Sequence, residues 1–110
     1  MDLSSHKQDK FFIVRVGGRM DATTAPDFEK SCLEWIGQGE SALIVDLKDL
    51  EYMSSAGLRS ILVVGKKVKS EGGTLAFTAL TPNVEHVFSI SGFGSMFKVH
   101  DSLESALKNT

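Results

Sequence analysis

The sequence predicts an α/β fold: a small mixed, mainly parallel β-sheet of four to five strands covered by about four helices. β-rich segments alternate with segments in which apolar residues recur at helical spacing. Turns that contain glycine separate most of these segments. The short apolar run Ala42–Leu47 is typical of a central strand that is buried on both faces. Because strands that alternate with helices need crossover connections, the sheet should be largely parallel.

The first strand is predicted at Phe11–Val16, a segment rich in β-branched and aromatic residues. The pair Gly17–Gly18 either breaks this strand or turns it back into a short strand near Arg19–Met20. In the second case the two strands would form an antiparallel edge of the sheet.

The first predicted helix follows a cap at Thr23 or Thr24, has Pro26 in its first turn, and ends at Gly37 and Gly39. Its residues at helical spacing are Phe28, Cys32, Trp35 and Ile36. The helix should therefore turn one apolar stripe toward the sheet.

The second predicted helix follows Ser54–Ser55 and ends at Gly72–Gly73. Its apolar stripe consists of Leu58, Ile61, Leu62, Gly65 and Val68. A strand is predicted next, at Thr74–Leu80.

The last third of the chain repeats this alternation. A third helix is predicted from Thr81–Pro82 to Ser91–Gly92, and a short strand at Phe97–Val99. Asp101 or Ser102 then caps a final helix.

Composition limits the function classes. The 110 residues leave room for a single domain, 1–110, and are 42% hydrophobic and 24% charged, as expected for a folded chain. A net charge of −2 disfavours nucleic acid as the main partner. The single cysteine, Cys32, excludes an intrachain disulfide and should be a small core residue. With no signal peptide in residues 1–10 and no apolar run of about 18 residues, we expect a cytoplasmic protein without membrane insertion.

Motifs of common enzymes are missing from the sequence. It contains no GxxxxGK[ST] loop, no GxGxxG loop and no GxSxG turn. His6, His86 and His100 are far apart and do not combine with cysteine or carboxylate at metal-ligand spacing. The sequence therefore predicts a protein that is not an enzyme, with no catalytic residues, no metal and no cofactor.

The most informative segment is LEYMSSAGLRSIL, residues 50–62. Ser54 or Ser55 can be the N-cap of the second helix, with Ala56 and Gly57 small so that the helix lies close to the sheet. Alternatively, a hydroxyl at this position is a modification site, because a phosphate is tolerated at the positive end of a helix. Spacing alone favours the cap, and the two interpretations are compatible.

Three blocks of this sequence together resemble the STAS-domain family of anti-sigma factor antagonists, and the resemblance covers nearly the whole chain. The blocks are GRMD (Gly18–Asp21), LIVDLKDLEYMSSAGLRSIL (Leu43–Leu62) and GGTLAFTALTPNVEHVFSISGF (Gly72–Phe93). The first block is weak alone, but the three in this order are specific. The resemblance implies the STAS fold for the predicted α/β sheet.

The resemblance also implies a function in bacterial partner switching. The unphosphorylated antagonist would bind a serine kinase of the GHKL type that is also an anti-sigma factor, and so free the sigma factor. The kinase would phosphorylate the antagonist at the helix start and release it, and a PP2C-type phosphatase would reset it. The alternative is a STAS interaction subunit of a transport ATPase, or a signalling scaffold, without sigma-factor regulation.

Family members often carry the phosphoacceptor directly before the glycine, where this chain has Ala56. The SSAGL sequence resembles a second version of the motif, which nominates Ser55, with Ser54 in reserve. A third possibility is that neither serine is modified and that the protein binds its partner constitutively.

The candidate partner-binding residues are Asp21, Met53, Ser54, Gly57 and Arg59. Asp21 either contacts the partner or stays solvated, and Met53 is either an exposed contact or a core residue. Arg59 lies near the positive end of its helix, which makes a partner-contact role worth testing; the alternative is an arginine that is simply solvated. Asp46 should fix the following loop by accepting a backbone hydrogen bond.

Overall fold

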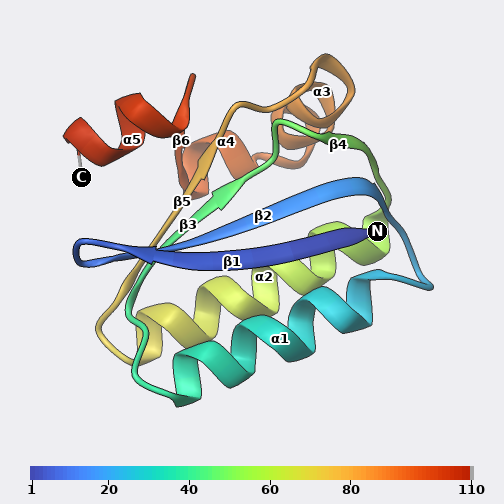
Figure 1. Cartoon of the computed structure of the whole chain (residues 1–110). Helices are drawn as coiled ribbons and strands as arrows, with labels where there is room; N and C mark the ends of the chain where they lie inside the picture. Colours follow the sequence, from blue (N-terminus) through green and yellow to red (C-terminus); the bar gives the residue numbers. More distant parts are fainter. Residues whose placement is uncertain (110) are drawn as a thin grey trace.

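The computed structural model describes residues 1–109. Within this range the chain forms a six-stranded sheet and five helices (Figure 1). The elements are β1 (Asp2–Gln8), β2 (Phe11–Met20), α1 (Ala25–Gly37), β3 (Ala42–Asp46), β4 (Leu50–Met53), α2 (Ser55–Ser70), β5 (Thr74–Thr78), α3 (Pro82–Ser91), α4 (Phe93–Met96), β6 (Lys98–His100) and α5 (Leu103–Asn109).

The sheet has the order β1-β2-β3-β5-β6, and β4 pairs with the far end of β2. All pairings are parallel except that of β1 with β2. β3 occupies the centre, and its residues Leu43, Ile44 and Val45 are buried. The predicted α/β class and the central strand are therefore confirmed.

The antiparallel edge differs from the prediction. β2 runs without a break through Gly17 and Gly18, and the glycine pair produces only a register shift against β4, with Gly18 at φ +85°. The antiparallel partner is instead β1, which precedes the predicted strand and joins it through a turn at Asp9 and Lys10. β1 is polar and mostly exposed, so main-chain pairing holds it and no apolar pattern marks it in the sequence.

Two further elements were not predicted. Residues 48–53, expected as a connection, contain β4, and α4 follows α3 after Gly92, whose φ of +79° ends that helix. At the end of β5, Ala79 has a positive φ of +56°, so the strand stops before Leu80. Both unpredicted elements are only four residues long, too short for a clear periodicity.

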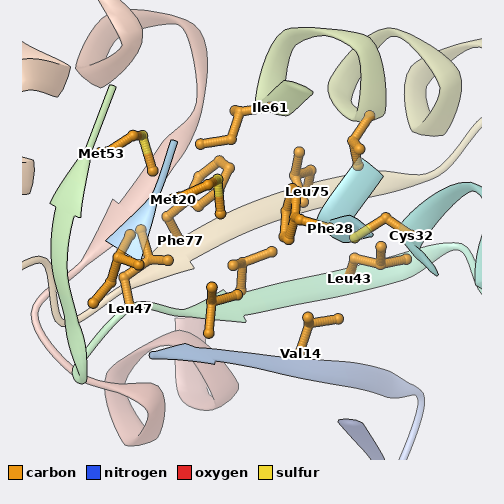
Figure 2. Packing of buried hydrophobic residues seen from close by; sticks show 14 of the residues in the cluster. Val14, Met20, Phe28, Cys32, Leu43, Leu47, Met53, Ile61, Leu75 and Phe77 are labelled. Carbon is orange, nitrogen blue, oxygen red and sulfur yellow. The ribbon is translucent and has the colours of Figure 1, made fainter. Parts of the chain in front are cut away.

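The helices form two unequal layers. α1 and α2 lie side by side across one face of the sheet, where they bury the main core (Figure 1). On the other face α5 covers a small cluster in which Ala106 meets Phe11, Ile13 and Ile44. Cys32 is buried in the main core (Figure 2), as predicted. No helix in residues 1–109 is both long enough and apolar enough to cross a membrane.

Candidate functional site

The start of α2 lies at the end of the sheet where β2 and β4 both stop. The Ser54 N–H donates to the Met20 carbonyl oxygen over 2.9 Å, which ties the first residue after β4 to the last residue of β2. Asp21, the residue after Met20, is thereby placed beside the Ser54–Ser55 segment. Two motifs that are about 30 positions apart in the sequence meet at this junction.

The two serines are in different environments. Ser54 is the N-cap of α2 and has extended backbone, but its Oγ is buried and has no hydrogen-bond partner in the part of the chain that the structure describes. Ser55 is the first residue of α2 and is exposed. An enzyme that modifies this segment can reach the Ser55 hydroxyl in the folded protein, whereas the Ser54 hydroxyl is enclosed.

Met53 and Gly57 lie under the helix start. Met20 and Met53 are neighbours on β2 and β4, and their side chains extend to the same side of the sheet, toward α2 (Figure 2). A Cβ on Gly57 would lie 2.8 Å from Met53 Cγ and 3.2 Å from both Met20 Cγ and the Met20 carbonyl oxygen. The glycine therefore lets α2 approach the sheet closely.

Their burial changes the role of two sequence-predicted partner contacts. Met53 is only 3% exposed and Gly57 is buried, so neither presents a side chain to a partner in this conformation. The alternative of a core position holds for Met53. Both residues pack beneath the helix start that carries the neighbouring serines.

Asp21 closes the turn that leads into α1. Its Oδ1 accepts the backbone N–H groups of Thr23 at 3.0 Å and Thr24 at 3.2 Å. Thr24 Oγ1 in return accepts the Asp21 N–H at 2.9 Å and donates to the Arg19 carbonyl oxygen. Thr24 is the N-cap residue, as predicted, but the side chain that accepts backbone N–H groups is that of Asp21.

These bonds also determine the charge of Asp21. The backbone hydrogen bond from Thr23 is the largest cause and lowers the pKa of the Asp21 carboxyl. Desolvation opposes it in part, and the hydrogen bonds from Thr24 lower the pKa further. The carboxylate is therefore ionised in the turn before α1, and Asp21 is half-buried rather than fully solvated.

Two arginines lie near this junction. Arg59 is exposed on α2, one turn after Ser55, and none of the ion pairs or side-chain hydrogen bonds among residues 1–109 includes it. The Arg19 guanidinium lies over the Tyr52 ring, 4.2 Å from its centroid, where β2 pairs with β4. Arg19 and Tyr52 were not predicted as site residues, because their pairing depends on β4.

Asp46 has the predicted structural role. Its Oδ1 accepts the Lys48 N–H at 3.1 Å, which fixes the turn between β3 and β4. Asp46 Oδ2 also lies 4.0 Å from Arg15. Asp46 thus holds the loop that leads into β4.

The junction presents an exposed hydroxyl to solvent, that of Ser55. Residues 1–109 contain no group of three or more His, Cys, Asp or Glu residues placed to hold a metal ion. Burial raises the pKa of the Cys32 thiol to about 12, so this cysteine is no nucleophile. The junction offers an exposed hydroxyl at a helix N-terminus and a carboxylate fixed in the adjoining turn. Four positions after the hydroxyl, Arg59 has no ion pair within residues 1–109.

Comparisons with known proteins agree with this architecture. The STAS domain family matches residues 2–106. BtrV of Bordetella bronchiseptica, assigned as an anti-sigma factor antagonist, is 38% identical over 106 residues, which cover 96% of this chain and 91% of BtrV. An anti-sigma-B factor antagonist of Staphylococcus aureus is 26% identical, with 94% of this chain and 96% of that protein covered.

A solved anti-sigma factor antagonist from Mycobacterium paratuberculosis has the same fold. Its TM-score is 0.89 at 25% identity, and the match covers 97% of this chain and 91% of that chain. These relatives are regulators rather than enzymes, which confirms the prediction of a non-catalytic protein. The chain belongs to the STAS-domain family of anti-sigma factor antagonists.

Proposed function

We propose that this protein is a cytoplasmic anti-sigma factor antagonist that is switched by phosphorylation of Ser55. Unphosphorylated, it binds a serine kinase of the GHKL type that is also the anti-sigma factor. Phosphorylation releases the kinase, and a PP2C-type phosphatase restores the binding form. The observation that carries this proposal is the contrast between the exposed Ser55 and the enclosed Ser54 hydroxyl.

The transfer itself needs no catalytic group from this chain. The Ser55 Oγ attacks the γ-phosphorus of ATP in the kinase, an Oγ–P bond forms, the bond from this phosphorus to the bridging oxygen breaks, and ADP and a proton leave. The phosphoserine adds about −1.5 to −2 charge at neutral pH. Because Ser55 is the first residue of α2, this charge lies at the positive end of the helix and leaves the fold intact.

Release of the partner follows from desolvation. A partner that covers the start of α2 would have to bury the new dianion, which costs several kcal/mol unless a counter-ion compensates. The assignments of BtrV and of the Staphylococcus aureus relative support an anti-sigma factor as this partner. Asp21, Ser54 and Arg59 are the proposed contact residues around Ser55, and Met53 and Gly57 hold them in place.

The direct test is phosphorylation by the cognate kinase with ATP, followed by mapping of the phosphate by mass spectrometry. We expect phosphate on Ser55 in the wild type and in Ser54→Ala, and none in Ser55→Ala. Phosphate on Ser54, or elsewhere in the chain, would contradict the assignment of Ser55. A stable complex with the kinase but no phosphate on any serine would indicate a constitutive binder instead.

Binding gives the second measurement. Ser55→Asp should weaken kinase binding by at least about tenfold, while Ser55→Ala should retain it. Neither variant should lose stability because Ser55 is exposed, and Ser55→Asp should gain slightly through the helix dipole. Loss of binding in both variants, together with a large drop in melting temperature, would assign Ser55 a structural role only.

A further inference from the structure

We propose that Arg59 is the internal counter-ion of phosphorylated Ser55. Phosphorylation then acts twice. It adds a dianion of which one guanidinium offsets only about half, so the surface that the partner covers becomes more negative, and it withdraws Arg59 from any contact with the partner. This inference rests on the proposed function, since it assumes that Ser55 is the residue that carries the phosphate.

Helical geometry brings the two side chains together. Ser55 and Arg59 are both exposed on α2 and are four positions apart. Residues at this spacing have Cβ atoms about 5–6 Å apart on the same side of a helix. Side chains on a helix also lean toward its N-terminus, so the long Arg59 side chain is able to reach back toward Ser55.

Arg59 is free to make this contact. Within residues 1–109 it has neither an ion pair nor a side-chain hydrogen bond. By contrast, Lys67 on the same helix is paired with Glu71 at 3.3 Å, and Arg19 is stacked on Tyr52. Ala56 and Gly57, which lie between the two residues, have no side-chain oxygen that would compete with the phosphate for the Arg59 guanidinium.

The charges at the start of α2 favour the pair only after phosphorylation. A cation near the positive end of a helix is unfavourable, and the first turn of α2 holds no acidic residue that would offset it. A phosphate on Ser55 would supply that anion, and a guanidinium binds phosphate through paired N–H groups.

The test uses protein in which phosphoserine is incorporated at position 55 during synthesis, so that no kinase is needed. Phosphorus NMR then follows the titration of the phosphate. A cation at this spacing favours the dianion, so Arg59→Gln should raise the midpoint of the titration by about half a pH unit. Arg59→Lys should give a smaller rise, because lysine keeps the charge but lacks the paired donors.

Lys66→Gln is the matched control. Lys66 is exposed on the same side of α2 but lies 11 positions beyond Ser55, or about 16 Å along the helix. At this distance salt screens its charge, so the midpoint should stay within about 0.1 unit of the wild type. Equal midpoints in wild type and Arg59→Gln, or equal shifts in Arg59→Gln and Lys66→Gln, would overturn the proposal.

The experiments distinguish failure of the proposed phosphorylation of Ser55 from failure of the proposed role of Arg59. If no kinase modifies Ser55, the mapping experiment fails while the titration still reports whether Arg59 pairs with the phosphate. If Ser55 is the acceptor but Arg59 is not its counter-ion, mapping succeeds and Arg59→Gln leaves the midpoint unchanged.

Discussion

The starts of α1 and α2 lie next to each other at the same end of the sheet (Figure 1). They differ in whether the backbone N–H groups of the first turn have hydrogen-bond partners. At α1 the Ala25 N–H bonds the Asp21 carbonyl oxygen at 2.8 Å, Pro26 has no N–H, and the Asp27 N–H bonds the Thr24 carbonyl oxygen at 3.0 Å. At α2 the N–H groups of the first turn, residues 55–57, have no hydrogen-bond partner within residues 1–109.

The side chains at the two helix starts show the same contrast as the backbone N–H groups. The turn before α1 is closed by Asp21 and Thr24, which bond to each other's backbone N–H groups, and Asp27 adds negative charge in the first turn. The N-cap hydroxyl of α2, on Ser54, makes no such bond, and no acidic residue follows it. The start of α1 is thus complete within the chain, whereas the start of α2 keeps its donors and its positive end available for an anion.

The largest effect on stability should come from Gly57→Ala, which disturbs the close packing of α2 against the sheet. The new Cβ would lie 2.8 Å from Met53 Cγ and 3.2 Å from the Met20 carbonyl oxygen, so β2, β4 or α2 must shift. We expect the free energy of unfolding to fall by about 1–3 kcal/mol in urea titrations. Gly37→Ala is the control: a Cβ there meets no atom within 4 Å, and its stability should be equal or higher. Equal stability of Gly57→Ala and wild type would mean that the side chains of Met20 and Met53 move aside without a cost in free energy.

The next effect concerns Asp21, which closes the turn before α1. Hydrogen bonds lower the folded-state pKa of Asp21, so its carboxylate stabilises the fold above the ordinary aspartate pKa, and this contribution is lost as the pH falls through the lower folded-state value. Asp21→Ala should therefore lower the urea midpoint at neutral pH and approach the wild type in strong acid. Asp21→Asn, which keeps an acceptor oxygen, should lie between the two. If the urea midpoint of Asp21→Ala were lower than that of the wild type by the same amount at every pH, the charge of the carboxylate would not be the cause.

A smaller effect is expected when α2 is given the negative charge that α1 already has. Ser55→Asp should raise the free energy of unfolding by about 0.3–1 kcal/mol through the helix dipole, and added salt should reduce this gain. Chemical denaturation at low and high salt would measure it. A loss of stability in Ser55→Asp would show that the first turn of α2 is not open to an anion.

The smallest effect is expected for Ser54→Ala. Loss of an N-cap serine usually costs about 1 kcal/mol, but the Ser54 Oγ accepts no hydrogen bond in this fold. The urea midpoint should therefore change less than it does in Asp21→Ala. A loss as large as that of Asp21→Ala would mean that Ser54 caps α2 in solution, and the contrast between the two helix starts would then disappear.

Much of the fold could be predicted because the responsible signals are local. The apolar run of β3 and the stripe that includes Phe28 and Cys32 depend on neighbours in the sequence, and each appears in the structure where it was expected. β1 could not be predicted in this way, since its residues are polar and only pairing with β2 makes it a strand. The same holds for β4, whose four residues become a strand beside the end of β2.

Local patterns in the sequence are sufficient to predict the α/β class, the order of the main elements and the pair of serines at the start of α2. Which of these serines is accessible depends on the tertiary structure. The Ser54 N–H is drawn to the Met20 carbonyl oxygen, a residue 34 positions earlier, while Gly57 brings the helix down onto the methionines. Burial of one hydroxyl and exposure of the next result from these long-range contacts, and no local pattern contains them.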